Sequence, residues 1–400
     1  MTFKKIAGKV HLWLGIPTGL VVFIVAITGC LYCFQEEIGW LYDDYKTVEA
    51  QDQAFISPSE VHKIGEEAIP GKHIHSVIYG DKTDALEVVY YEAEPEFYHM
   101  VYLNPYNGDV IKVVNMEAGF FHFVLEGHIY LWMGEFGKTI VSYSTLIFLV
   151  ILISGLILWW PRNRKAAKKR LKLSWTDRTK WKRRNYDLHN VLGFYASTIA
   201  LLIAITGLVY AFSWFSEGLY GITGGESSPT FVWPQNVSAT ADKAELDAPA
   251  IDLIWQQMVK EYPDVSTIEM HYPVGEGYTV YAYMRYSEGT YWDTDSRYFD
   301  SRTLEEIVPG HIWGKLETAS TADMIRRMNY DIHVGAIGGI AGKIIVFLSS
   351  LIVGSLPVTG ITIWWGRRKK KTKKNTPSKS SSNSRKKAVS RTREKKPELV

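Results

Sequence analysis

Four apolar stretches, each long enough to cross a bilayer, constrain most strongly how this chain can fold. Residues 12–34, 139–160, 191–214 and 344–365 contain no charged side chain. A helix needs about 20 apolar residues to span the hydrocarbon core of a bilayer. Buried helices of soluble proteins are rarely so long without a charge, so the sequence predicts four transmembrane helices. The first stretch is too long for a cleaved signal peptide, and three more follow it.

The distribution of charge predicts the orientation of these helices. The net charge is only +3, yet 30 of the 45 Lys and Arg residues lie in residues 1–9, 161–184 and 366–400. Basic segments stay on the cytoplasmic side of a bacterial inner membrane. We therefore expect a multi-pass protein with both termini in the cytoplasm. Its basic tail is typical of a disordered segment near anionic membrane lipid, and nothing else in the chain resembles a nucleic-acid-binding module.

The four spans contain an internal repeat. Span one aligns with span three at an offset of 178 residues, and span two aligns with span four at an offset of 205, both without a gap. The identities pair His11 with His189, Thr28-Gly29 with Thr206-Gly207, Tyr32 with Tyr210, His128 with His333, Gly137-Lys138 with Gly342-Lys343, Gly155 with Gly360, and Trp159-Trp160 with Trp364-Trp365. This pattern predicts two parallel copies of one unit, related by an axis along the membrane normal.

The spans and their repeat divide the chain into eight parts. In chain order these are 1–34 (cytoplasmic N-terminus and first span), 35–127 (first extracytoplasmic module), 128–160 (second span), 161–187 (basic cytoplasmic loop), 188–214 (third span), 215–332 (second extracytoplasmic module), 333–365 (fourth span) and 366–400 (basic cytoplasmic tail).

Four histidines occupy equivalent positions near the ends of the spans. Under the repeat axis, His11 and His189 meet near the cytoplasmic side, and His128 and His333 meet near the outer side. Two imidazoles that face each other across a helix bundle suit the iron of a haem, so we expect two bis-His haems and an electron path across the membrane. Histidines that cap helix ends, or a zinc or copper site, remain alternatives. The chain has no CxxCH motif, so a covalently attached haem is excluded.

The position of the outer pair raises one difficulty. A continuous helix from His128 to Trp160 would be about 48 Å long, well beyond a bilayer core of about 30 Å. A break near Gly134 and Gly137 would let His128 fold back toward the membrane. His122 is a rival ligand, but its spacing of six residues from His128 places it on another helix face.

Small residues and cysteines in the spans suggest further roles. Gly15 and Gly193 follow the two inner histidines by four residues and would let a neighbouring helix or a flat cofactor approach closely. Cys30 and Cys33 lie on one side of the first helix, where they could pack or serve in redox chemistry. Two cysteines cannot build a multi-cysteine metal site.

The two outer segments are each predicted as a small α+β module, with one helix on an antiparallel sheet. The first has a helix that begins at Ser57 and ends before Pro70, and the second has a helix over 248–262. The predicted strands are 73–79, 85–91, 98–103 and 109–114 in the first module, and 267–272, 278–285 and 296–299 in the second. Neither module contains a nucleophile elbow or a phosphate-binding loop.

Two groups of outer residues could bind a ligand. His73 and His75 share one face of a predicted strand and could bind a metal, although a solvated face explains them as well. A group of aromatic residues could hold a planar or chelate ligand, or could be core and interface residues. It comprises Tyr278, Tyr281, Tyr283, Tyr286, Tyr291 and Trp292.

These motifs resemble the PepSY-associated transmembrane helix family of bacterial iron-regulated membrane proteins, over about residues 5–368. The resemblance rests on AITG after His11 and His189, on the endings WWPRNRK and WWGRRKK, and on SPSEVHKIGEEAIPG followed by YLNPYNGDVIKV, which is similar to a PepSY module. It implies a four-helix inner-membrane protein with two b-type haems, ligated by His11, His189, His128 and His333. Many relatives have Leu-His-Arg where this chain has Gly127-His128-Ile129.

The resemblance also implies a function, that of a transmembrane oxidoreductase in iron acquisition. Electrons from a cytoplasmic or quinol donor would reduce a ferric siderophore or similar chelate outside, because hard oxygen ligands hold Fe(II) less tightly than Fe(III). The alternative is a non-redox module whose PepSY segments bind a peptide or protein partner. A transporter is disfavoured because no ionisable residue lies mid-span. No nicotinamide or flavin fingerprint is present, so the donor is a separate molecule.

Overall fold

Four long helices dominate the computed structural model, which describes residues 2–39, 41–161, 163–237, 246–275 and 277–374. They are α1 (Phe3–Tyr32), α5 (Gly134–Trp159), α7 (Trp181–Ala211) and α12 (Gly339–Lys374). All four are long and apolar enough to cross a membrane, which confirms the predicted spans. Helix α12 continues past Trp365 to Lys374, so it includes the start of the segment predicted to be disordered. The rest of that predicted tail lies outside the described residues.

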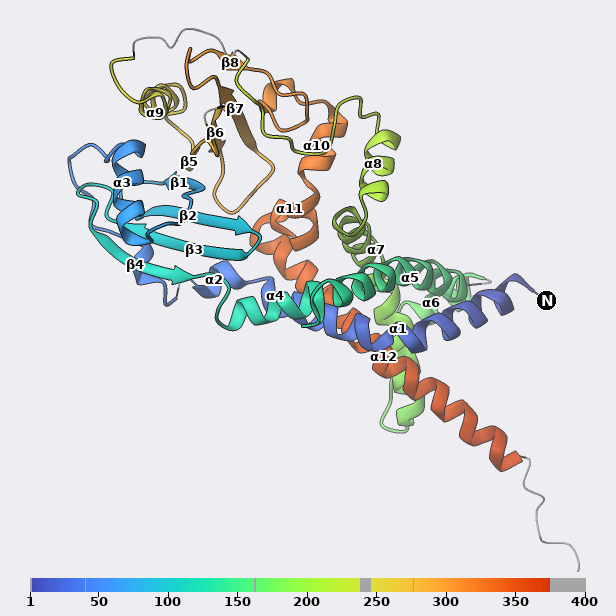
Figure 1. The fold of residues 1–400 in the computed structure, drawn as a ribbon. Helices are drawn as coiled ribbons and strands as arrows, with labels where there is room; N and C mark the ends of the chain where they lie inside the picture. The colour runs from blue at the N-terminus through green and yellow to red at the C-terminus, as the bar shows by residue number, and fades with distance from the viewer. Residues whose placement is uncertain (1, 40, 162, 238–245, 276, 375–400) are drawn as a thin grey trace, which may run out of the picture.

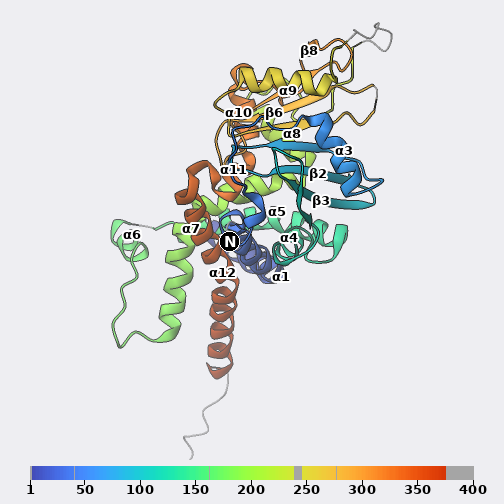
Figure 2. The same cartoon turned by 90° about the vertical axis from the view of Figure 1, so that its left-hand side faces the viewer.

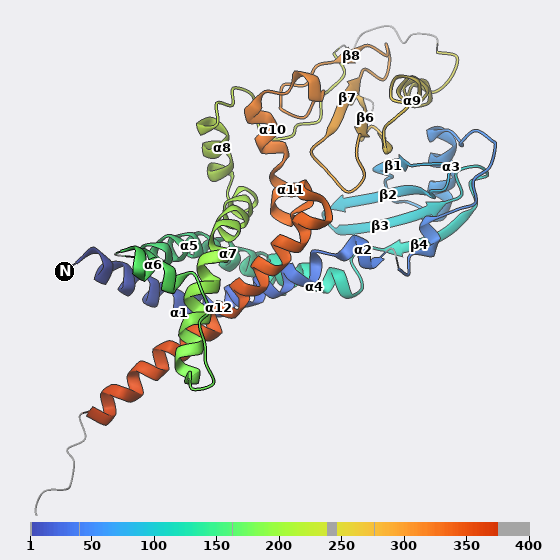
Figure 3. The ribbon, with the colours of Figure 1, turned by 180° about the vertical axis from the view of Figure 1, so that it is seen from behind.

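The four helices form a ring in which α1 and α7 occupy opposite corners. Each of these two helices packs against both α5 and α12. At the centre, Leu152 of α5, Ala200 and Ala204 of α7 and Val353 of α12 form a small buried apolar cluster. The N-terminus and the described end of α12 both lie away from the sheet (Figures 1 and 3).

The second span is broken after His128, as predicted, because a continuous helix from His128 to Trp160 would be longer than the bilayer core. Helix α4 (Phe120–Tyr130) ends there, and Leu131 and Trp132 adopt φ values of 50° and 56° before α5 begins. The turn packs backbone on backbone, because a Cβ on Gly137 would lie only 1.6 Å from the carbonyl oxygen of Tyr130. Only glycine, which has no Cβ, fits such a contact. The break lets α4 pack against α1.

The fourth span is broken in the same way. Helix α11 (Asn329–Val334) ends at Gly335, whose φ is 86°, and a short 3-10 turn (Ala336–Gly338) leads to α12. A Cβ on Gly342 would lie 2.2 Å from the carbonyl oxygen of Gly335. Gly137 and Gly342 differ by 205 positions, so equivalent residues in the two halves make equivalent turns.

The two outer segments form one sheet rather than two separate modules. Its eight antiparallel strands run in the order β4-β3-β2-β1-β5-β6-β7-β8, so the first strand of each segment lies at the centre. The junction pairs Ser76 with His271 and Tyr79 with Ile268. The strands are β1 (Ser76–Tyr79), β2 (Leu86–Ala93), β3 (Glu96–Leu103), β4 (Val110–Asn115), β5 (Thr267–His271), β6 (Val280–Arg285), β7 (Thr294–Phe299) and β8 (Glu306–Ile307).

One hydrophobic core serves both outer segments. Helices α3 (Pro58–Ala68) and α9 (Ala250–Glu261) lie next to each other over the sheet (Figure 2). Ser57 and Glu60 form the capping box that starts α3. Asp252 of α9 then accepts hydrogen bonds from the backbone N–H and hydroxyl of Ser59, at 2.8 and 2.6 Å. These contacts explain why the two helices share a single apolar layer.

A loop of the sheet is hydrogen-bonded to residues at the ends of the membrane helices that lie nearest to the sheet. The hydroxyl of Tyr291, between β6 and β7, donates a hydrogen bond to Glu36 of α2 (Gln35–Gly39). The buried Lys343 of α12 forms ion pairs with Glu36 and Glu37 at 3.1 and 2.8 Å. The backbone N–H of Tyr291 also donates to Asp331 of α11, at 2.9 Å. The sheet is therefore held directly beside the helix that carries His333.

The remaining described helices are short. They are a 3-10 turn at Asp44–Lys46, α6 (Arg164–Arg170), α8 (Ser213–Ile222), a 3-10 turn at Leu316–Thr318 and α10 (Thr321–Arg327).

Candidate functional site

The structure brings the four predicted histidines together as two pairs. The ring centres of His11 on α1 and His189 on α7 are 6.3 Å apart, and their planes lie at 88°. The ring centres of His128 on α4 and His333 on α11 are also 6.3 Å apart, at 68°. His128, and not its rival His122, is therefore the residue that faces His333.

Each inner histidine is oriented by a hydrogen bond to a neighbouring helix. Nδ1 of His11 lies 3.1 Å from the carbonyl oxygen of Ile151, which can only accept, so this nitrogen carries the proton. Nδ1 of His189 lies 2.9 Å from the hydroxyl of Thr359. That hydroxyl already donates its single proton to backbone carbonyls such as that of Ser355, so its oxygen accepts from Nδ1–H. In both rings Nε2 is left with its lone pair.

The outer histidines repeat this arrangement. Nδ1 of His128 lies 2.9 Å from the carbonyl oxygen of Val25 on α1 and donates to it. Nδ1 of His333 lies 2.9 Å from the hydroxyl of Thr206 on α7. That hydroxyl donates to the carbonyl of Leu202, so it too accepts from the imidazole. In all four rings Nδ1 thus carries the proton and is hydrogen-bonded to another helix. This is the tautomer of a histidine that binds a metal through Nε2.

A glycine of a neighbouring helix faces each ring. A Cβ on Gly155 of α5 would lie 3.2 Å from Cε1 of His11, and one on Gly360 of α12 would lie 3.4 Å from Cε1 of His189. These two glycines occupy equivalent positions of the repeat, and no role was predicted for them. Gly29 and Gly207 stand in the same relation to His128 and His333, with distances of 3.0 and 3.4 Å. Glycine at these positions gives each imidazole the room to lie flat against the adjacent helix.

The separation within each pair fits a six-coordinate haem iron. Two iron–nitrogen bonds of about 2 Å each, plus about 1 Å from each nitrogen to its ring centre, place the ring centres about 6 Å apart. A structural zinc site usually needs four protein ligands. Within the described residues, no three His, Cys, Asp or Glu side chains are grouped to hold a metal ion. Each pair offers two nitrogen ligands at the spacing that a bis-His haem requires.

A cavity of about 450 Å³ surrounds the inner pair. Binding pockets for flat organic ligands have volumes of this order, about 300–1,000 Å³. Gly15 and Gly193 both line the cavity, and a Cβ on Gly15 would meet nothing within 4 Å, so its lack of a side chain widens the cavity. Stacked rings of Trp159 and Phe194, 3.6 Å apart, form another part of the wall. The cavity is thus mostly apolar, with two imidazoles inside it.

The two pairs lie at different depths in the helix ring. On α7, His189 belongs to the inner pair and Thr206 supports the outer pair, about 26 Å further along at 1.5 Å per residue. Leu152 and Val353 of the buried apolar cluster line the cavity of the inner pair, and Ala204 of the same cluster lies two residues from Thr206. Because α4 folds back, the outer pair lies against α1 near Val25 instead of beyond the end of α5.

Two hydroxyls were missed as site residues. Ser154, whose oxygen lies 3.1 Å from Nδ1 of His11, and Thr359 beside His189 differ by 205 positions, the offset of the second repeat. Applying that offset to polar residues as well as to identical ones would have found them. Cys30 and Cys33 are free thiols that donate to backbone carbonyls of other segments, at 3.4 and 3.6 Å. Their contacts are those of packing residues.

His73 and His75, near the start of the sheet, have a different environment from the one predicted. Strand β1 begins at Ser76, one residue after His75, whose backbone N–H donates to the carbonyl of Val89 in β2 at 2.8 Å. The ring centre of His75 lies 4.9 Å from that of His271 and 6.2 Å from that of Trp233.

Burial governs the protonation of His75 and His271. It lowers the pKa of His271 to about 3, and together with the nearby His271 it lowers the pKa of His75 to about 4. Tyr281 stacks on His271 at 4.3 Å, which assigns this member of the aromatic group to packing. Both histidines are therefore neutral at physiological pH.

The fold defines a membrane protein with four apolar helices and an α+β sheet region, whose paired histidines lie between helices that are distant in sequence. The sequence profile of the family described as the PepSY-associated TM region matches residues 9–367. The chain belongs to this family. Among proteins with curated descriptions, none matches the chain significantly.

Proposed function

We propose that this protein transfers electrons across a bacterial inner membrane through two b-type haems. Its electrons would come from a cytoplasmic or quinol donor and would reduce a ferric siderophore or similar chelate on the side of the sheet. The observation that carries the proposal is the pair geometry. Two pairs of imidazoles, each 6.3 Å apart, have Nδ1 hydrogen-bonded to another helix and Nε2 left for a metal.

The side chains have distinct tasks in this scheme. Bound haem would supply a one-electron couple between Fe(III) and Fe(II). His11 and His189 hold the inner position, and the apolar walls of the cavity exclude water from it. His128 and His333 hold the outer position, and the ring of Tyr210 lies 6.1 Å from His333 on this side. The buried apolar cluster of Leu152, Ala200, Ala204 and Val353 carries no charge.

The same proposal includes two parallel repeats with cytoplasmic termini. Residues at an offset of 178 (Thr28 and Thr206) and of 205 (Gly155 and Gly360) make matching contacts with their histidines. The N-terminus and the end of α12 lie away from the sheet, and both are strongly basic. This arrangement supports basic segments in the cytoplasm and a sheet outside it.

A second candidate function is peptide or protein binding by the sheet, without redox chemistry. Strand β4 lies at one edge of the sheet, and its apolar residues Val110, Ile111 and Val113 are 48%, 40% and 46% exposed. An exposed apolar edge strand can pair with a strand of a partner. This function needs no cofactor, so the two candidates are distinguished by haem content.

The test is the haem content of purified full-length protein. We expect a reduced-minus-oxidised absorption spectrum of b-type haem and two haems per chain after expression with ample haem. One haem per chain would limit the electron path to a single pair and contradict the proposal. Protein without haem would support the binding function of the sheet.

A further inference from the structure

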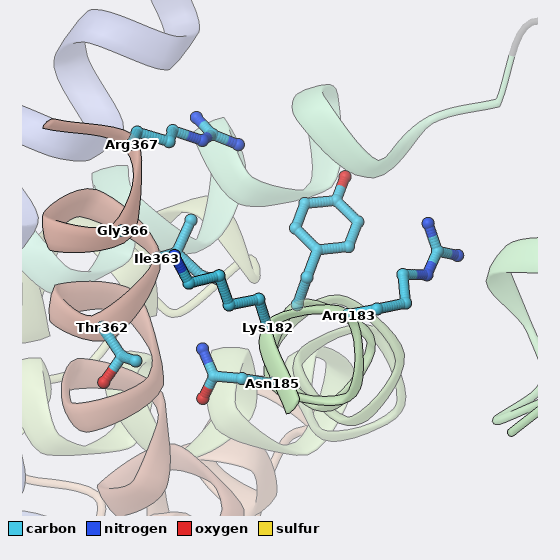
Figure 4. A pocket seen from close by; sticks show the side chains of 8 residues that line it. Lys182, Arg183, Asn185, Thr362, Ile363, Gly366 and Arg367 are labelled. Atoms are coloured by element: carbon cyan, nitrogen blue, oxygen red, sulfur yellow. The ribbon is translucent and has the colours of Figure 1, made fainter. Parts of the chain in front are cut away.

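A second, basic cavity opens beside the inner histidine pair. It has a volume of about 340 Å³ and lies between one face of α7 and one face of α12. Three of its lining residues are cationic: Lys182 and Arg183 on α7, and Arg367 on α12 (Figure 4). We call these three residues the basic mouth.

The cavity of the basic mouth adjoins the cavity around His11 and His189. Arg367, Tyr186 and Ile363 line both spaces. Among the described residues that line the histidine cavity, Arg367 is the one with a permanent charge, and apolar residues and glycines make up most of the rest. A ligand that fills both spaces must therefore have an apolar body and an anionic edge.

Two of the three cations are available for such a ligand. Arg183 already pairs with Asp187, at 2.9 Å. No ion pair found in the described part of the chain uses the side chain of Lys182 or of Arg367. Both are exposed, as suits groups that meet an anion at the edge of the membrane.

We propose that the basic mouth binds the carboxylates of the flat cofactor held between His11 and His189, which are the two propionates of haem. This inference rests on the proposed function and adds the orientation of the cofactor. Its polar edge faces the cytoplasmic end of the helices, where a donor arrives, and its apolar edge faces the centre of the membrane.

Solvation decides this orientation. A carboxylate turned toward the centre of the membrane would lie near Leu152 and Val353, where burial of an unpaired charge is strongly unfavourable. Turned the other way, it meets the guanidinium of Arg367, which can bind a carboxylate with two parallel hydrogen bonds. The phosphate of an anionic lipid has the same recognition chemistry, so the test must separate these two sources of anion.

The experiment uses full-length protein with His128→Ala, which leaves the inner pair as the only complete pair. We compare Arg367→Gln and Arg367→Lys with the parent, and Arg178→Gln, in the basic loop between α5 and α7, is the matched control. Each protein is loaded with haem or with haem dimethyl ester, whose carboxylates are blocked. The readout is the rate at which the cofactor transfers to apomyoglobin.

We expect Arg367→Gln to lose haem about tenfold faster than the parent, as when a charge-assisted contact is lost, while Arg367→Lys and Arg178→Gln lose it at the parent rate. The dimethyl ester should leave all four proteins at similar rates. Equal haem loss from Arg367→Gln and the parent would overturn the inference, as would a variant effect that persists with the ester. If native mass spectrometry instead shows that Arg367→Gln loses bound anionic phospholipid and keeps haem, the basic mouth is a lipid site. Failure of the wild-type protein to bind haem would refute the proposed function itself, before any variant is measured.

Discussion

The imidazole planes of His11 and His189 are nearly perpendicular, at 88°, with ring centres 6.3 Å apart. Each plane is set by a different helix, because His11 donates to Ile151 of α5 and His189 donates to Thr359 of α12. The ring planes are therefore a property of the helix packing and not of the two histidines alone.

This perpendicular arrangement predicts a spectroscopic signature. Perpendicular imidazoles donate equally to two iron d orbitals and leave them close in energy, whereas parallel imidazoles split them. We expect electron paramagnetic resonance of the oxidised protein to show a strongly anisotropic low-spin signal with one large g value. A rhombic three-line signal as the only low-spin species would contradict the ring geometry.

Replacement of an inner histidine should remove one cofactor and leave the other. In His11→Ala or His189→Ala, one of the two ligands of the inner pair is lost, so we expect haem content to fall from two per chain to one. The optical spectrum of the remaining haem should match that of the outer pair. His122→Ala is the control, because His122 does not face His333. Unchanged stoichiometry in both inner variants would refute the assignment.

The glycines beside the rings offer a graded test. A Cβ on Gly29 would lie 3.0 Å from His128, too close for a ring that is held by a hydrogen bond, whereas a Cβ on Gly207 would lie 3.4 Å from His333, an ordinary contact. We expect Gly29→Ala to weaken retention of the outer haem several-fold and Gly207→Ala to change it little. Alanine favours helix by about 0.5–1 kcal/mol, so neither backbone should be destabilised. Equal retention in the two variants would contradict this reading.

The turn between α4 and α5 should tolerate no side chain at Gly137. Alanine there would place Cβ 1.6 Å from the carbonyl oxygen of Tyr130, so the turn must open and move His128. We expect Gly137→Ala to lose the outer haem and keep the inner one, as counted by haem per chain. Gly218→Ala is the control, because a Cβ at Gly218 meets nothing within 4 Å. Two haems in Gly137→Ala would show that the turn does not position His128.

Acid should destabilise the centre of the sheet through His271. Burial lowers the pKa of His271 to about 3. Below pH 6.5, its ordinary pKa, this histidine is therefore protonated in the unfolded chain and stays neutral in the folded sheet. The free energy of unfolding should then fall by ~1.4 kcal/mol per pH unit, or about 2 kcal/mol between pH 6.5 and 5. His75 acts in the same direction, whereas the raised pKa of the buried Glu269 acts in the opposite direction. The aromatic neighbours Tyr281 and Trp233 stay neutral in this range.

The His271 effect is isolated by comparing two proteins. Hydrogen-exchange protection of the β1 and β5 amides, corrected for intrinsic rates, should decrease between pH 7 and 5 in the wild type and decrease less in His271→Gln. His122→Gln, which changes a histidine outside the sheet, should behave as the wild type does. The same pH dependence in His271→Gln and the wild type would exclude this histidine as the cause.

Some elements were readable from the sequence because their causes are local. Uncharged runs of about 20 residues predict spans wherever they lie. The helix start predicted at Ser57 is confirmed, and the structure shows Ser57 as the N-cap of α3. The pairing of His11 with His189 could be predicted because the two residues occupy equivalent positions of an ungapped repeat. Their distance in the sequence gives no information about whether they are in contact.

Other features could not be read from the sequence because they depend on segments meeting in space. The pairing of Ser76 with His271 joins two modules that looked independent, since each predicted strand was bounded by its own turns. His75 resembled a strand residue, yet it precedes β1 and packs on His271 from the other segment. Pairing between strands nearly 200 residues apart is decided when the two segments dock, because backbone hydrogen bonds are the same for almost every residue type.

The sequence by itself determined four apolar spans, their basic flanks and the symmetric positions of four histidines, since composition and periodicity suffice for these. Only the tertiary structure decided that α4 folds back at Gly137, that the ring planes of His11 and His189 cross, and that the two outer segments share one sheet. Each of these depends on close contact between backbones or on a hydrogen bond to another helix. Such contacts are set by packing, which no single segment specifies alone.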